Sequence, residues 1–256
     1  IDASWHMPAQ KRNPAEEYLN AHIPNSVFFD LDKNSEKDTD LPHMLPKQEA
    51  WEKIMSSLGI NNNDDILIYD NSDLKSSCRC WFSLIYFGHD EKKIHILNGG
   101  LKKWIFENKP ITKLTTEIID SNYVASEKEN LVVSFDQIKK NILSKSFNVI
   151  DARSLERFEG KVSEPRKGLR SGHIQNSFCL PFNLCINQKT GEFKNLEELR
   201  ELFNQNENIE KELDQVFTCG SGVTAAVLAY AYKMVNNDYI PKIYDGSWSE
   251  YGKYPA

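Results

Sequence analysis

An internal duplication constrains the fold of this chain more than any other feature of its sequence. The matched pairs, spaced by about 150 residues, are Asp2-Ala3 with Asp151-Ala152, His22-Ile23 with His173-Ile174, and Gly99 with Gly246. A chain of 256 residues is long enough for two domains of roughly 100 to 150 residues, each with its own core. We therefore expect two copies of one domain.

Each copy alternates short β-branched runs with helical patterns. In the first copy, apolar runs at residues 66–69 and 94–97 flank a helical pattern at 76–87. This alternation predicts an α/β fold in which each domain is a mainly parallel sheet flanked by helices. The polar stretch from residue 105 to 130, rich in Lys, Thr, Glu and Asn, is the best linker candidate. We place the N-terminal domain at 1–115, the linker at 116–130 and the C-terminal domain at 131–256.

The second copy carries a cysteine loop, Cys219-Gly220-Ser221-Gly222-Val223-Thr224, between an apolar run at 216–218 and a helical pattern from 223 to about 234. Glycines admit backbone conformations that turn several N–H groups inward, where they form a cradle for negative charge. The positive end of the helix dipole adds to this and stabilises a thiolate. The pattern favours a nucleophilic or sulfur-carrying cysteine over one buried for packing.

Two other cysteine chemistries do not fit the loop. A cysteine-dependent phosphatase needs an arginine six positions after the cysteine to hold phosphate, and this chain has Ala225 there. A Cys-x-x-Cys redox motif needs a second cysteine where Gly222 stands. Small neutral residues around the sulfur suit a persulfide rather than a phosphate.

In the first copy, Asp70 stands at the position of Cys219. A carboxylate cannot perform thiol chemistry. We therefore expect the N-terminal domain to be catalytically silent and to keep the fold.

The cysteine loop resembles the active-site loop of 3-mercaptopyruvate sulfurtransferases in the rhodanese superfamily. The resemblance covers nearly the whole chain, with further matches at Asp2-Ala3-Ser4-Trp5, His22 to Asp30, Leu41 to Pro46, Arg157 to Gly160, Glu164-Pro165-Arg166, Gly172-His173-Ile174 and Tyr244 to Glu250. It implies sulfur transfer through a Cys219 persulfide. The donor would be 3-mercaptopyruvate, and the acceptor would be a thiol such as thioredoxin, or cyanide.

The resemblance also implies the other site residues. Arg157 and Arg166, which we expect on a loop after a strand at 148–150, match the arginines that bind the carboxylate and carbonyl of mercaptopyruvate. Ser221 would work with His43 and Asp32 from the first domain in a proton relay. The binding residues of the loop itself would be Gly220, Gly222, Val223 and Thr224. No metal or organic cofactor is implied, and Arg153 and Arg170 are weaker candidates that we do not assign.

Equivalent histidines and the remaining cysteines have a structural interpretation. His22 and His173 occupy matching positions, including one in the silent copy, which favours a role in the fold. Five cysteines without framework spacing indicate free thiols in a reducing compartment. Those outside the loop are interpreted as packing residues, and their sequence positions are Cys78, Cys80, Cys179 and Cys185. Trp5 and Trp248 are expected in the core or at an interface.

Bulk properties limit the partners. A net charge of −6 and a pI near 5.6 argue against nucleic-acid binding as the main role. The longest apolar stretch is far shorter than the roughly 20 residues of a membrane span, so we expect no membrane insertion. We expect a cytoplasmic protein, with an organelle matrix as the alternative. The sequence begins without Met, so the removal of a leader peptide stays an open alternative.

Three alternatives to mercaptopyruvate sulfur transfer remain. Thiosulfate:cyanide sulfurtransferases carry basic side chains in the loop for a dianionic sulfonate, whereas this loop has Gly220, Ser221 and Gly222. A non-enzymatic persulfide carrier has no need of Arg157 and Arg166. A purely structural pseudoenzyme has no need of Cys219.

Overall fold

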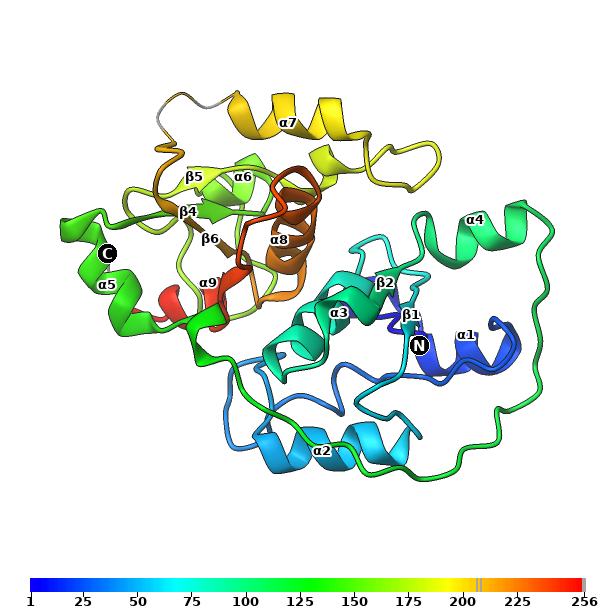
Figure 1. The fold of residues 1–256 in the computed structure, drawn as a ribbon. Helices are drawn as coiled ribbons and strands as arrows, with labels where there is room; N and C mark the ends of the chain where they lie inside the picture. The colour runs from blue at the N-terminus through cyan, green and yellow to red at the C-terminus, as the bar shows by residue number, and fades with distance from the viewer. Residues whose placement is uncertain (206, 208, 255–256) are drawn as a thin grey trace. The chain divides into compact units, whose positions relative to one another are not determined.

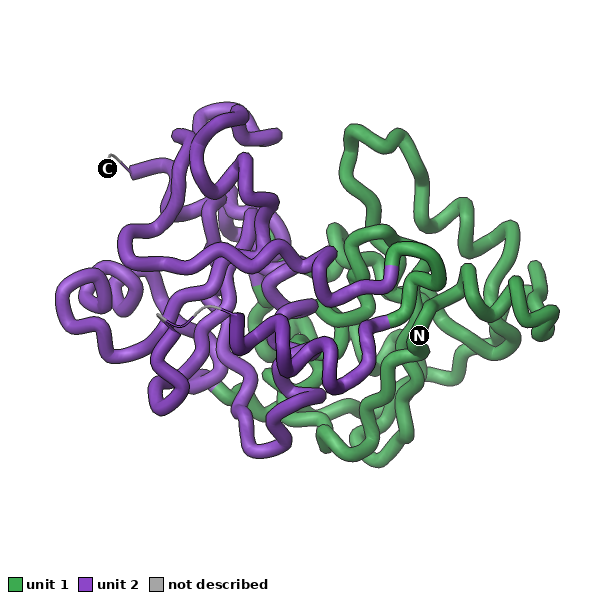
Figure 2. Tube along the Cα trace, turned by 90° about the horizontal axis from the view of Figure 1, so that it is seen from above, with its two compact units in different colours: residues 1–37, 45–128, 188–192 green, residues 38–44, 129–187, 193–256 purple. Residues whose placement is uncertain are grey.

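The computed structural model describes residues 1–205, 207 and 209–254. The chain divides into two compact units, coloured separately in Figure 2. Unit 1 comprises residues 1–37, 45–128 and 188–192; unit 2 comprises residues 38–44, 129–187 and 193–256. Each unit therefore takes one short segment from elsewhere in the chain.

Unit 1 is built around two parallel strands. Its elements are the 3-10 helices η1 (Pro8–Gln10) and η2 (Glu91–Lys93), the helices α1 (Pro14–Asn20), α2 (Gln48–Ser57), α3 (Ser77–Tyr86) and α4 (Gly100–Phe106), and the strands β1 (Ile66–Ile68) and β2 (Ile94–Ile96) (Figure 1). Ile66 pairs with Ile94 in parallel register. Asp2 forms isolated parallel bridges with Phe28 and with Tyr69, the residue after β1. These bridges add further parallel pairing to the two-stranded sheet. The strands and the helix expected at 66–97 are confirmed to within one residue at each end.

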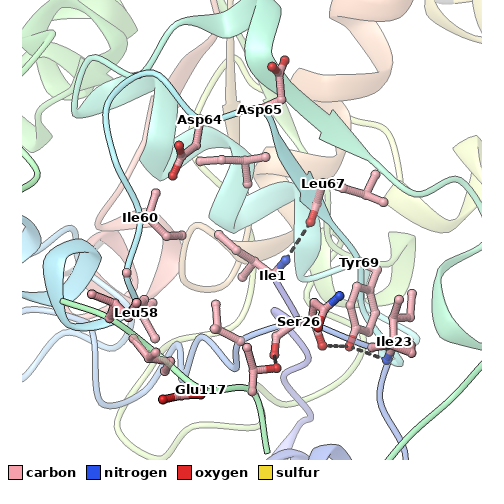
Figure 3. Close-up of a pocket in the computed structure, with 18 residues that line it drawn as sticks. Ile1, Ile23, Ser26, Leu58, Ile60, Asp64, Asp65, Leu67, Tyr69 and Glu117 are labelled. Carbon is pink, nitrogen blue, oxygen red and sulfur yellow. Dashed lines mark hydrogen bonds between the residues drawn. The ribbon is translucent and has the colours of Figure 1, made fainter. Parts of the chain in front are cut away.

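Aromatic packing joins α2 to the end of α3 and to the segment at Phe29 in unit 1. Trp51 of α2 is fully buried, stacks on Phe87 with ring centroids 4.6 Å apart and meets the edge of Phe29 at 5.7 Å. Such aromatic pairs contribute beyond the area that they bury. A cavity of about 600 Å³ lies beside β1, lined by Ile1, Ser26, Tyr69 and other residues of this unit (Figure 3). None of the predicted site residues lines it.

Unit 2 contains a five-stranded parallel sheet in the order β3-β7-β6-β4-β5. The strands are β3 (Val132–Val133), β4 (Phe147–Asp151), β5 (Phe178–Cys179), β6 (Asp214–Thr218) and β7 (Lys242–Tyr244). The helices are η3 (Glu129–Leu131), α5 (Phe135–Ser144), α6 (Leu155–Phe158), η4 (Phe182–Cys185), α7 (Leu196–Asn204), α8 (Val223–Val235) and α9 (Ser247–Tyr251). This unit confirms the predicted parallel sheet with flanking helices.

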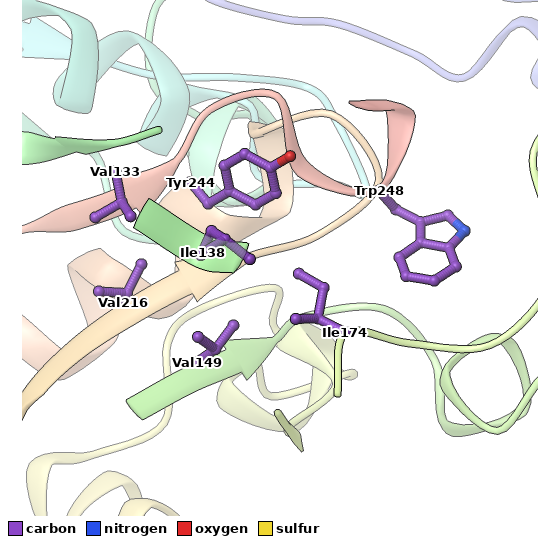
Figure 4. Packing of buried hydrophobic residues seen from close by; sticks show 7 residues of the cluster. All are labelled: Val133, Ile138, Val149, Ile174, Val216, Tyr244 and Trp248. Atoms are coloured by element: carbon purple, nitrogen blue, oxygen red, sulfur yellow. The ribbon is translucent and has the colours of Figure 1, made fainter. Parts of the chain in front are cut away.

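The two faces of this sheet are covered by different helices. Val216 of β6 belongs to a buried cluster with Ile138 of α5 and Trp248 of α9 (Figure 4). The next residue, Phe217, meets Phe203 of α7 and Tyr232 of α8 edge-on, with centroids 6.4 and 6.0 Å apart. Successive strand residues point to opposite faces, so the alternation along β6 fixes which helices pack on each side.

The polar stretch after α4 contains no helix or strand among residues 107–128. These residues belong to unit 1, where Thr112 bridges His22 and Ser126 N–H donates to the Phe87 carbonyl at 3.0 Å. The domain limits at 1–115, 116–130 and 131–256 stay a prediction.

Candidate active site

Cys219 directly follows β6, at the carboxyl end of the central strand of the unit 2 sheet. The register pairs Thr218 at the end of β6 with Asp151 at the end of β4, so the loops that follow these two strands begin side by side. Ligands of open α/β sheets bind outside the carboxyl ends of the strands. The strand, loop and helix predicted around Cys219 are confirmed as β6, residues 219–222 and α8.

The loop around the sulfur is held by one downstream side chain. Ser247 Oγ accepts hydrogen bonds from Cys219 N–H at 3.3 Å and Gly222 N–H at 3.1 Å, and donates to the Tyr244 carbonyl at 2.8 Å. Gly222 has a φ of +79°, a left-handed conformation that glycine adopts without strain. Ser247 lies in the segment Tyr244 to Glu250, which resembles the family, but no local pattern there predicts a contact with the cysteine loop.

The N–H groups of Ser221, Val223 and Thr224 are candidates for binding a ligand or the sulfur. Ser221 N–H donates to Cys219 Sγ at 3.5 Å. Val223 and Thr224 open α8, where N–H groups have no partner within the helix and the helix dipole is positive. Gly222 N–H donates to Ser247 Oγ, and the binding role expected for Gly222 stays a prediction.

Both predicted arginines reach the loop next to the nucleophile. A Cβ atom on Gly220 would lie 3.2 Å from Arg157 Nη2 and 3.5 Å from Arg166 Nη1. A side chain at position 220 would therefore compete with the guanidinium groups for space. The structure places both arginines beside Gly220, the residue after Cys219, and their role in substrate binding stays a prediction.

The prediction of a loop at Arg157 was wrong. Residues Leu155–Phe158 form the one-turn helix α6, which Ser154 caps by accepting a hydrogen bond from Arg157 N–H at 3.5 Å. A serine ahead of a short helical run is a common start signal that the glycine-rich surroundings obscured. Arg166 does lie in a loop.

A buried chain of ion pairs lies behind Arg157. Glu164, whose side chain is only 2% exposed, accepts from Arg157 Nη2 at 2.5 Å and from Arg153 Nη1 at 2.8 Å. Arg153 also donates to Asp151, and its guanidinium carbon lies 4.3 Å from the Trp248 ring centroid. Burial by itself lowers the pKa of Arg153, but Asp151 and Glu164 together hold that pKa above its ordinary value. Neither the burial of Arg153 nor a role for Glu164 follows from the local sequence.

Ser221 is the meeting point of two further predicted residues. His43 Nδ1 lies 2.9 Å from Ser221 Oγ, and Arg166 Nη2 donates to the same oxygen at 3.3 Å. His43 is buried with a left-handed φ of +62°, a strained conformation for a non-glycine residue. Although we expected His43 in the first domain, its segment, residues 38–44, belongs to unit 2 (Figure 2).

Asp32 lies in unit 1. Its Oδ1 accepts a hydrogen bond from Trp5 Nε1 at 2.9 Å. The relay that would join Asp32 to His43 and Ser221 stays a prediction.

The Asp70 loop of unit 1 repeats the backbone of the cysteine loop without its chemistry. Leu101 N–H donates to the Asp70 carbonyl at 2.9 Å, as Trp248 N–H does to the Cys219 carbonyl at 2.9 Å. The Asp70 carboxylate accepts from the backbone of Ser72 and Ser77, so it acts as a cap. The two copies therefore share this backbone hydrogen bond as well as the sequence pattern.

The two equivalent histidines make structural contacts. His22 lies 2.7 Å from the Tyr18 carbonyl and stacks on the Tyr18 ring, and His173 lies 2.8 Å from the Phe158 carbonyl and stacks on that ring. Their predicted role in the fold is confirmed. Trp5 and Trp248 are both buried, as expected.

Of the other cysteines, Cys179 contacts the buried chain of ion pairs, since its Sγ donates to the Arg153 carbonyl at 3.7 Å. Cys78 and Cys80 are buried in α3 and Cys185 is buried in η4, while Cys179 is partly exposed. No disulfide joins any of the five cysteines, all of which the structure describes. Within residues 1–205, 207 and 209–254, no group of three His, Cys, Asp or Glu side chains is placed to hold a metal ion, and no helix is long and apolar enough to cross a membrane.

A duplicated α/β domain with a cysteine loop after the central strand of one copy defines a tandem thiol-based transferase. The rhodanese-like domain model matches residues 11–107 and 134–254, so both copies are recognised. The chain belongs to the rhodanese-like family.

Named relatives cover nearly the whole chain. It is 38% identical to Thiosulfate/3-mercaptopyruvate sulfurtransferase 1, mitochondrial, of Arabidopsis thaliana, over 100% of this chain and 72% of that protein. It is 35% identical to the 3-mercaptopyruvate sulfurtransferase of Homo sapiens, over 98% of this chain and 84% of that protein. The crystal structure of SseA from Escherichia coli, a 3-mercaptopyruvate sulfurtransferase, matches with a TM-score of 0.86 and 35% identity, covering 98% of this chain and 92% of that one.

Proposed function

We propose that this chain is a 3-mercaptopyruvate sulfurtransferase that carries sulfur on Cys219 and releases pyruvate. The observation that carries the proposal is the convergence of Arg157 and Arg166 on Gly220, beside the cysteine. Two guanidinium groups are suited to a carboxylate and an adjacent carbonyl, because each presents parallel donors. The relatives named for this reaction support the same donor.

In the first half-reaction, the Cys219 thiolate attacks the sulfur of 3-mercaptopyruvate. A sulfur–sulfur bond forms, the carbon–sulfur bond of the donor breaks, and its electron pair passes to carbon as the enolate of pyruvate. A proton then converts the enolate to pyruvate, and Cys219 keeps the persulfide. The N–H groups of Ser221, Val223 and Thr224 would stabilise the negative sulfur.

Ser221 and His43 would handle the proton. The 2.9 Å separation between His43 Nδ1 and Ser221 Oγ is within the range for proton transfer. Arg166 at the same hydroxyl would hold the substrate carbonyl against it. Asp32 is the proposed acidic member of this relay.

In the second half-reaction, a thiol attacks the outer sulfur of the persulfide. The acceptor keeps that sulfur as its own persulfide, and Cys219 returns as the thiolate. We propose a small thiol or thioredoxin as the physiological acceptor, with cyanide as a substitute in the test tube. The proposed location is the cytoplasm; an organelle matrix is the alternative, which the mitochondrial relative favours.

Thiosulfate is the second candidate donor, because one relative is named for both donors. Loop residues 220–222 bear no positive charge. The space that a side chain at position 220 would fill is bordered by Arg157 and Arg166. A carboxylate monoanion suits this loop better than the dianionic thiosulfate.

Steady-state kinetics with the two donors test the proposal. Purified protein is given 3-mercaptopyruvate with a thiol acceptor and, separately, thiosulfate with cyanide. We expect a higher kcat/KM for mercaptopyruvate, and we expect Arg166→Lys to raise its KM by about tenfold because the bidentate contact is lost. The exposed Arg200 of α7 gives the matched control, Arg200→Lys. A higher kcat/KM for thiosulfate would favour the alternative, and no turnover with either donor would leave the persulfide carrier.

A further inference from the structure

Glu164 is a buried acid inside a site that must bind an anion. Its Oε1 accepts from Arg157 Nε at 3.2 Å and its Oε2 from Arg157 Nη2 at 2.5 Å, so the carboxylate grips the guanidinium at two points. An unpaired acid at this depth would repel an anionic substrate, and a paired one still weakens the field of its partner. The arrangement therefore costs binding strength unless it contributes something else.

The first contribution is position. Among the residues that the structure describes, Glu164 is the only acceptor of the Arg157 guanidinium. Its grip occupies Nε and one Nη2 hydrogen, while the Nη1 hydrogens and the second Nη2 hydrogen are left for a ligand. Glu164 is itself fixed by Arg153, whose side chain is fully buried and paired with Asp151. Arg157 is thus held at one orientation before the substrate arrives.

The second contribution is charge. Asp151, Arg153, Glu164 and Arg157 form one row of alternating charges that sums to zero. Arg157 consequently still offers directional hydrogen bonds to a ligand. Its positive electrostatic potential, however, is largely cancelled by Glu164 beyond contact distance. Such a site discriminates by geometry and penalises a second negative charge on the ligand.

We propose that Glu164 is a positioning and selectivity residue, which orients Arg157 and makes the site prefer a monoanionic carboxylate to a dianion. This inference rests on the proposed function, since it concerns the choice between 3-mercaptopyruvate and thiosulfate. It adds a determinant outside the cysteine loop.

The variant Glu164→Gln tests the charge. It keeps the shape of the side chain and removes one negative charge, so we expect the ratio of kcat/KM for thiosulfate to kcat/KM for mercaptopyruvate to rise about tenfold. Glu159→Gln is the matched control. Glu159 lies five residues before Glu164 in the sequence and forms a half-exposed ion pair with Lys161, so the variant removes the same charge outside the buried row. We expect the ratio of the two kcat/KM values to stay unchanged.

The variant Glu164→Asp tests the position separately. It keeps the charge and shortens the reach, so we expect the KM for mercaptopyruvate to rise about tenfold with kcat and the donor ratio close to wild type. This variant also decides the positioning role if Glu164→Gln does not fold. Folding of both is checked by thermal melting and circular dichroism.

Equal losses with both donors and an unchanged ratio in folded Glu164→Gln would overturn the inference. So would a Glu164→Asp variant whose KM equals that of wild type. If wild-type protein releases no pyruvate from mercaptopyruvate, the proposed function fails first and the inference with it; an active wild type with an unchanged variant ratio contradicts the inference alone.

Discussion

Ser247 Oγ accepts a hydrogen bond from the backbone N–H of Cys219 at 3.3 Å. The backbone of Cys219 is therefore held by the first side chain of α9. In the sequence, the whole of α8 lies between these two residues. Because the same oxygen binds Gly222 N–H, it ties both ends of the cysteine loop to one point. The loop conformation depends on this hydroxyl as well as on its glycine.

Replacing this hydroxyl loosens the loop. Ser247→Ala leaves two buried N–H groups without their acceptor, and we expect a loss of about 1–3 kcal/mol in the free energy of unfolding. We also expect lower kcat/KM, because the loop donors lose their fixed direction. Urea unfolding and donor kinetics measure the two effects. Ser144→Ala, at an exposed serine, is the control, and equal stability of the two variants would contradict the role of Ser247.

A methyl group on Gly220 would displace Arg157 and Arg166, the proposed substrate-binding arginines. Its Cβ would lie 3.2 Å from Arg157 Nη2, which is closer than most Cβ contacts. We expect Gly220→Ala to raise the KM for mercaptopyruvate about tenfold with a smaller effect on stability, since misplaced binding groups lose orientation. Gly168→Ala adds a methyl where nothing lies within 4 Å but at a left-handed φ of +82°, so it should lower stability and leave KM unchanged. A wild-type KM in Gly220→Ala would contradict the placement of Arg157.

Three thiols should resist alkylation while the protein is folded. Burial raises the pKa values of Cys80, Cys179 and Cys185 to about 12, so these thiols stay protonated at pH 8 and are poor nucleophiles. A short iodoacetamide pulse followed by peptide mass mapping checks this. All three should be labelled only after unfolding in urea. Labelling of any of them in the native protein would contradict the assignment.

The same burial makes the protein sensitive to alkali. Cys80 and Cys185 have folded pKa values of about 12 against an ordinary value of 9.0, so the unfolded chain releases their protons first as pH rises. Their contribution is complete below pH 9 and is lost progressively toward pH 12, with each thiol removing about 1.4 kcal/mol per pH unit. Urea unfolding at pH 8 to 11 measures the slope. Cys185→Ala should make it shallower, and an unchanged slope would contradict burial as its cause.

Local sequence patterns predicted the parts of the site that depend on local structure. The apolar run, the glycines and the helical pattern around Cys219 gave β6, the loop and α8, because each is determined by neighbouring residues. The duplication predicted two copies, and Asp70 identified the copy that has no cysteine at the position of Cys219. The family resemblance added Arg157, Arg166, Ser221 and His43, which the structure brings together in unit 2.

The contacts between distant segments were not predictable in this way. Nothing in the sequence near Glu164 distinguishes a buried acid from an exposed one, because its burial follows from the packing of Arg153 on Trp248. Ser247 serves a loop 25 residues or more away. The segment with His43 joins unit 2 through tertiary contacts that no periodicity reveals.

The mass of the intact protein after incubation with 3-mercaptopyruvate, without any acceptor, tests the central claim most directly. We predict an increase by the mass of one sulfur atom, with one pyruvate released per chain. The increase should be reversed by a thiol and absent in Cys219→Ser. Pyruvate release without added sulfur, or a sulfur atom that the Cys219→Ser variant still gains, would contradict sulfur transfer through Cys219.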